Sequence, residues 1–101
     1  MISVLIVDDL DLIRVGIRSL LESVSGIKVV AEAESGEQAV SLTRKLNPNI
    51  VLMDLQMPGM GGIEATKKLT HYVPDTKVIA LTICEEEPFP TRLMQAGAMG
   101  Y

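Results

Sequence analysis

The chain has 101 residues, a net charge of −4 at pH 7 and a single cysteine, Cys84. With 48% hydrophobic and 22% charged residues, it has the composition of one globular domain and not of a disordered chain. The acidic balance argues against this stretch gripping nucleic-acid phosphates or anionic membranes by itself, and one cysteine excludes an intramolecular disulfide and a multi-cysteine metal cage.

Segments typical of strands and of helices alternate along the chain. Short apolar, β-branched runs predict strands, whereas apolar residues that recur at spacings of three and four predict helices. The predicted strands are residues 3–7, 27–34, 50–53 and 77–81, and the predicted helices are residues 10–23, 36–47, 62–72 and 90–96. This alternation predicts an α/β fold with right-handed crossovers and a parallel sheet.

Side chains next to the predicted helices suggest where two of them begin and end. We expect Asp9 to cap the start of the first helix and Ser35 to cap the second. Pro48 forbids continuation of the second helix. The strand at residues 27–34 has a shorter apolar run than the first strand and includes charged residues, so we place it near the edge of the sheet.

The two ends of the sequence lead to separate expectations. The start, MISVLIVDD, has no basic region, and its apolar stretch is too short for a signal peptide or a membrane span, so we expect a soluble, cytoplasmic protein. The last residues, AGAMGY, have the glycines of a helix-to-strand turn, and Tyr101 would begin a fifth strand. We therefore expect a fragment of a longer protein, truncated at the start of strand five.

Acidic side chains follow two of the predicted strands. Asp8 and Asp9 come after the first strand with Asp11 close by, Asp54 ends the third, and Thr82 ends the fourth. Ligands of open parallel sheets collect at the carboxyl ends of the strands, so we expect these groups on one rim. Clustered carboxylates repel one another without a cation, and oxygen ligands with room for water suit Mg²⁺. Asp54 beside such an ion can attack phosphorus.

Taken singly, each of these residues also has a structural interpretation. Asp9 can be only a helix cap, Asp54 only a turn residue before the Pro-Gly segment, and Thr82 only a strand-end threonine. Their joint placement at one rim favours the site. His71 is predicted to be a solvated histidine at the end of the third helix that lies away from this rim, without a catalytic role.

Several motifs then occur in order along the chain, namely VLIVDD, IVLMDLQMPGMGGIEA, VIALT and AGAMGY. Together they resemble the receiver domain of bacterial two-component response regulators. LTICEEEPFP and MQAGAMGY look like the NarL/FixJ class, more narrowly the global activators of the GacA/UvrY/LetA type. The resemblance covers the whole chain and implies a doubly wound sheet of flavodoxin/CheY-like order 2-1-3-4-5. Residues 1–101 would be a receiver domain, incomplete at the C-terminus, with a helix-turn-helix DNA-binding domain expected beyond it.

The resemblance also implies roles for individual residues. Asp54 would take the phosphoryl group from a sensor histidine kinase or a small phosphodonor, and Thr82 and Tyr101 would be switch residues. The protein ligands of Mg²⁺ would be Asp8, Asp9, Asp54 and the backbone carbonyl of Gln56. Such a domain assists its own phosphotransfer but is not a dedicated enzyme. It would bind DNA only through a domain absent from this chain, and it would not bind a membrane. Formation of a homodimer is left open.

Three other functions stay open from the residues. A haloacid-dehalogenase-like phosphatase needs a second aspartate two positions after its nucleophile, where Gln56 stands. A flavodoxin-like flavin binder needs hydroxyls and glycines after the first strand to hold a phosphate, which DDLDL would repel. A degenerate or truncated receiver would act only as a protein-protein docking module. The lysine that the family carries after its Gly-Tyr pair lies beyond the end of this sequence, which favours the last of these alternatives.

Overall fold

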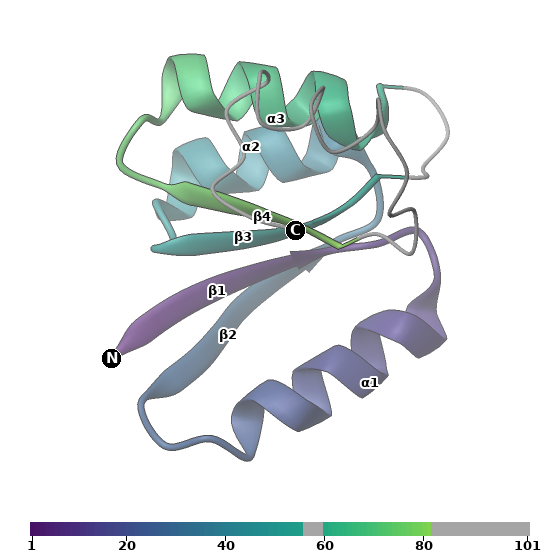
Figure 1. The fold of residues 1–101 in the computed structure, drawn as a ribbon, viewed down its shortest axis with the longest axis vertical. Helices are drawn as coiled ribbons and strands as arrows, with labels where there is room; N and C mark the ends of the chain where they lie inside the picture. Colours follow the sequence, from purple (N-terminus) through teal and green to yellow (C-terminus); the bar gives the residue numbers. More distant parts are fainter. Residues whose placement is uncertain (56–59, 82–101) are drawn as a thin grey trace.

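The computed structural model describes residues 1–55 and 60–81, which form a parallel sheet with helices on both faces (Figure 1). The elements are β1 (Ile2–Val7), α1 (Asp11–Glu22), β2 (Ile27–Ala33), α2 (Gly36–Leu46), β3 (Ile50–Asp54), α3 (Gly61–Tyr72) and β4 (Lys77–Leu81). The strand order is β2-β1-β3-β4, which confirms the α/β prediction and places β2 at an edge. The expected fifth strand and the helix at residues 90–96 lie outside the described residues.

The two faces of the sheet are covered unequally. Helices α2 and α3 cover one face, and α1 lies on the other, below β1 and β2 in Figure 1. On β3, Val51 and Met53 point toward α2 and α3 and are fully buried, whereas Ile50 and Leu52 on the α1 side are half-buried. The larger core therefore lies between the sheet and the α2–α3 layer, and it includes the last buried residues of β3.

Helix α1 packs on the sheet with only part of its apolar surface. The predicted apolar residues of this helix divide into two groups. Ile17 and Leu21 pack against side chains of β1 and β2. Leu10, Ile13 and Leu20 are 58%, 43% and 72% exposed. The apolar stripe is thus wider than the face that contacts the two strands, and the spacing of the residues predicts the helix without predicting which of them are buried.

The caps of α1 and α2 differ in how well the sequence predicts them. The Ser35 prediction is confirmed, because its side chain accepts a hydrogen bond from the Gln38 backbone N–H at 3.1 Å. The Asp9 prediction is wrong, since the N-cap of α1 is Leu10, which makes no side-chain capping hydrogen bond. The reason is local: the Asp8 carboxylate accepts the Leu10 N–H at 2.9 Å and forms the turn that leads into the helix.

The pairing of β1 with β2 contains a bulge. Val4 pairs with Val29, but Leu5 pairs with Ala31, so Val30 is passed over. After the bulge the partners are Ile6 with Glu32 and Val7 with Ala33.

Two buried threonines on facing helices offer a matched test of hydrogen bonding. Thr43 on α2 is fully buried, and its hydroxyl has no hydrogen-bond partner among residues 1–55 and 60–81. Thr66 on α3 is equally buried and donates its hydroxyl to the Gly62 carbonyl at 2.7 Å. We expect Thr43→Val to raise the free energy of unfolding by about 1 kcal/mol, because it removes a desolvated hydroxyl, and Thr66→Val to lower it by a similar amount. Thermal unfolding measures both changes, and a shift in the same direction for the two variants would contradict this account.

Candidate functional site

Three carboxylates from two neighbouring strand ends meet at the carboxyl edge of the sheet. Asp8, Asp9 and Asp54 each offer an oxygen, and these oxygens all lie within 4.8 Å of one another. The register explains why they meet. Strands β1 and β3 pair in parallel with Val7 opposite Met53, so Asp8, which follows β1, and Asp54, the last residue of β3, lie side by side at the edge of the sheet.

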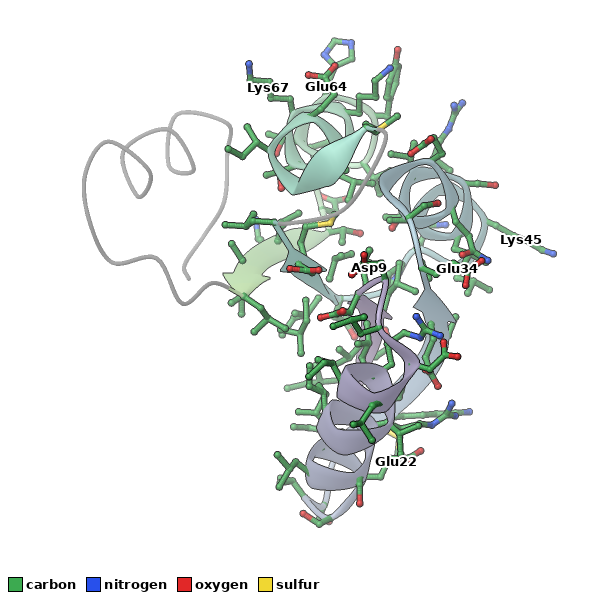
Figure 2. All side chains as sticks on the ribbon, turned by 90° about the vertical axis from the view of Figure 1, so that its right-hand side faces the viewer. Asp9, Glu22, Glu34, Lys45, Glu64 and Lys67 are labelled. Atoms are coloured by element: carbon green, nitrogen blue, oxygen red, sulfur yellow. The ribbon has the colours of Figure 1, made fainter. Side chains whose placement is uncertain are left out.

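Figure 2 looks onto this edge of the sheet, with Asp9 near the middle between α1 below and the α2–α3 layer above. The three carboxylates differ in exposure: Asp8 is buried, Asp54 is half-buried and Asp9 is exposed. The cluster is therefore open to solvent on the Asp9 side, which gives an ion or a phosphoryl group a path to it.

Hydrogen bonds at both its backbone and its side chain hold Asp8, the buried aspartate of the cluster. The Asp8 N–H donates to the Ala33 carbonyl of β2 at 3.0 Å. Its carboxylate accepts the Leu10 N–H at 2.9 Å, and its carbonyl accepts a hydrogen bond from the Arg14 guanidinium. Hydrogen bonds from the protein thus offset the cost of burying this residue and fix the loop between β1 and α1.

The end of β3 is positioned by very close packing of α3. A Cβ added at Gly62 would lie 2.3 Å from the Asp54 carbonyl oxygen and 2.7 Å from the Leu55 Cα, which leaves room only for glycine. The preceding residue, Gly61, has a φ of 74°, a conformation that side chains disfavour. The two glycines allow α3 to begin directly against the strand end that carries Asp54.

The donor set of the cluster fits a hard divalent cation. Carboxylate charges whose oxygens lie within 4.8 Å of one another repel when no cation is between them. Mg²⁺ takes one or two protein carboxylates together with waters and phosphate oxygens, and a cluster of carboxylates of this kind could supply such ligands. A cation among these oxygens would remove the repulsion and keep coordination positions for water or phosphate oxygens.

A basic side chain lies beside the cluster. Arg14 of α1 forms ion pairs with Asp11 and, through Nε, with Glu32 of β2 at 3.1 Å. Glu32 also accepts a hydrogen bond from Arg18 at 2.5 Å, and this bond raises the pKa of Arg18. Asp11 pairs with Arg14, and its side chain is 85% exposed. The residue pattern alone gives Arg14 no function. Glu32, a charged residue within a largely apolar strand, is the sequence feature that points to a basic partner on a neighbouring element.

Three further residues are predicted for the site, and His71 is predicted to lie away from it. Gln56, Thr82 and Tyr101 lie outside the described residues, so their roles stay predictions. His71 is exposed near the end of α3, and its ring contacts Tyr72 edge to face at 4.9 Å. Because the acidic cluster lies near the other end of α3, His71 takes no part in it.

Comparisons with known proteins agree with this geometry. Residues 4–101 match the family model of the response regulator receiver domain. Over 101 residues the chain is 57% identical to the response regulator GacA of Pseudomonas aeruginosa, of which it covers 47%. It is 54% identical to the response regulator UvrY of Escherichia coli K12, of which it covers 46%. The chain thus spans about half the length of these relatives, and the alignments include all of it.

Solved structures of the same kind superpose closely. A two-component response regulator of the LuxR family from Aurantimonas has a TM-score of 0.94 and 38% identity over 98% of this chain and 71% of its own. RcsB from Salmonella enterica, solved bound to the promoter rprA in the presence of the phosphomimetic BeF₃⁻, has a TM-score of 0.88 and 27% identity over 99% of this chain and 84% of its own.

Within the described ranges, no helix has the length and hydrophobicity needed to cross a membrane. The parallel sheet in the order β2-β1-β3-β4, the carboxylates at its edge and the match over residues 4–101 all lead to one conclusion. This chain belongs to the response regulator receiver domain family.

Proposed function

We propose that this chain is the phosphoacceptor receiver domain of a two-component transcriptional regulator. In this proposal Asp54 takes the phosphoryl group, and Asp8, Asp9, Asp54 and the Gln56 carbonyl hold Mg²⁺. The observation that supports it most directly is the convergence of three carboxylates within 4.8 Å at the carboxyl edge of the sheet. Buried strands reach this edge from behind, so the acceptor stands on a rigid element.

The chemistry follows from the position of Asp54 at the end of β3. Mg²⁺, when bound, supplies positive charge that offsets the charge of the phosphoryl group. A carboxylate oxygen of Asp54 bonds to phosphorus while the bond from phosphorus to the donor's nitrogen or oxygen breaks, which leaves an acyl phosphate. In this proposal the Thr82 hydroxyl donates to a phosphoryl oxygen and Tyr101 changes rotamer with it, as the family motif implies.

The proposal includes a partner that donates the phosphoryl group and a domain that responds to it. A sensor histidine kinase donates the phosphoryl group, and the output is a DNA-binding domain outside this chain, which makes residues 1–101 the receiver part of a longer cytoplasmic protein. The GacA and UvrY relatives, about twice as long as this chain, support the larger protein. The RcsB structure, bound to a promoter with a phosphomimetic present, supports the DNA-binding output. The domain assists its own phosphorylation and hydrolysis and is not a dedicated enzyme.

Phosphorylation by a small donor tests the proposal. Full-length protein treated with acetyl phosphate and Mg²⁺ is expected to gain one phosphoryl group, lost on hydroxylamine treatment as for an acyl phosphate, whereas Asp54→Asn gains none. The matched control is Asp11→Asn, an exposed aspartate outside the cluster, which is expected to label like the wild type. Equal labelling of Asp54→Asn would contradict the proposal, and absence of labelling in the wild type would favour a docking module.

A further inference from the structure

We propose that Arg14 is a positioning residue for the acidic cluster. Through its hydrogen bond to the Asp8 carbonyl, it sets the geometry of the loop that carries Asp8 and Asp9. This inference rests on the proposed function, since it takes the cluster to be a divalent-cation site. It adds a role on α1 for a residue that is not itself a metal ligand.

The guanidinium of Arg14 uses its donors on three different partners. One terminal nitrogen donates to the Asp8 carbonyl, the other pairs with the Asp11 carboxylate, and Nε donates to Glu32 at 3.1 Å. The side chain of Arg14 is only 12% exposed. A planar fork with several fixed donors can bridge a loop, a helix and a strand in this way, whereas a single ammonium cannot.

The acidic partner of this fork, Glu32, belongs to the sheet. Glu32 lies near the end of β2 and receives a second guanidinium, that of Arg18, at 2.5 Å. The next residue of β2, Ala33, accepts the Asp8 N–H at 3.0 Å. The Asp8 residue is therefore held on its N–H side by the backbone of β2 and on its carbonyl side by Arg14, which β2 also anchors. Such outer-shell support orients the groups that bind a metal.

Charge and positioning predict effects of opposite sign, which separates them. A guanidinium beside the cluster repels a divalent cation, so if charge alone mattered, removing Arg14 would tighten metal binding. If Arg14 holds the loop, removing it lets Asp8 and Asp9 spread apart, and binding weakens. Arg18 provides the matched control, because it pairs with the same Glu32 from the same helix and makes no contact with Asp8 among the hydrogen bonds and ion pairs of the described residues.

The test is binding of Mn²⁺ alone to the full-length protein, followed by the electron paramagnetic resonance signal of the free ion. We expect Arg14→Ala to raise the dissociation constant about tenfold and Arg18→Ala to change it by less than about twofold. The amide resonance of Leu10, which donates to the Asp8 carboxylate, is expected to shift in Arg14→Ala and to stay in place in Arg18→Ala. A pocket of about 250 Å³ beside Arg14 lets water fill the vacated space, which favours retention of the fold.

The outcomes separate the inference from the proposed function. Wild-type protein that binds Mn²⁺ while Arg14→Ala binds equally well or more tightly overturns the inference alone. Equal weakening by the Arg14 and Arg18 variants also overturns it, because the effect would then be general. Failure of the wild type to bind overturns the metal site and the inference with it. If Arg14→Ala does not fold, Arg14→Lys, which keeps the charge and loses the fork, is expected to bind more weakly than the wild type, and unchanged binding overturns the inference.

Discussion

Gly62→Ala is expected to destabilise the domain by roughly 2 kcal/mol and to displace Asp54. The added Cβ would lie 2.3 Å from the Asp54 carbonyl oxygen and 3.0 Å from the Asp54 carbonyl carbon, and both are backbone atoms that no change of rotamer can move. Normal contact requires α3 and the end of β3 to separate by roughly 1 Å. Overpacking of this kind costs about 1–3 kcal/mol or more, which outweighs the gain of up to about 1 kcal/mol in helix propensity.

The control for this prediction is Gly16→Ala. Gly16 lies inside α1, is exposed, and has nothing within 4 Å of an added Cβ, so alanine there is expected to stabilise the domain by about 0.5–1 kcal/mol. Thermal unfolding of the two variants should therefore shift in opposite directions. A second measurement, Mg²⁺-dependent labelling by acetyl phosphate, is expected to fall in Gly62→Ala and to stay unchanged in Gly16→Ala. Unfolding midpoints that rise for both variants would show that the end of β3 yields without cost.

Asp9→Asn is expected to weaken Mg²⁺ binding at least tenfold and, without the metal, to stabilise the fold. The variant removes one charge from a cluster whose carboxylate oxygens lie within 4.8 Å of one another. This loss lowers the attraction for a divalent cation and relieves repulsion in the empty site. Because Asp9 is exposed, solvent screening limits the gain in unfolding free energy to about 1 kcal/mol.

The two effects give a crossover that a structural role for Asp9 would not give. Without Mg²⁺ the Asp9→Asn variant should unfold at a higher temperature than the wild type, and with saturating Mg²⁺ the order should reverse, because only the wild type gains the full binding energy. Asp11→Asn keeps an oxygen that can accept from Arg14 and is expected to show neither effect. If Asp9→Asn is less stable than the wild type in the absence of metal, the repulsion is not present and the cation site is wrongly assigned.

The periodicity of apolar residues was sufficient to predict the strands and helices. The alternation of these elements then predicted the edge of the sheet at which the acidic residues meet. Apolar runs and spacings of three and four placed the ends of each described strand and helix to within one residue. The Asp9 cap was wrong because two adjacent aspartates competed for one turn, and propensity does not say which of them turns inward. Asp8 forms the turn, and Asp9 is left for the cluster.

The Arg14 contacts were beyond prediction for a different reason. In the helical pattern, Arg14 and Arg18 stand on the polar face, where arginines are usually solvated. Their shared partner, Glu32, is 18 residues after Arg14 and lies on another element. Only the tertiary packing of α1 against β2 brings the charges together, and a spacing rule that works within one helix does not report it.

The bulge at Val30 shifts the pairing register of β2 against β1 by one residue. Side chains of a strand alternate between its faces, so one passed-over residue reverses the assignment of every residue that follows. Without the bulge, Glu32 would pair with Val7 and point into the fully buried apolar layer beneath α2 and α3. Burying its charge there would be costly. The insertion instead sends Ala33 into that layer and turns Glu32 toward Arg14. A single added residue in an edge strand thereby decides that α1 has an acidic anchor.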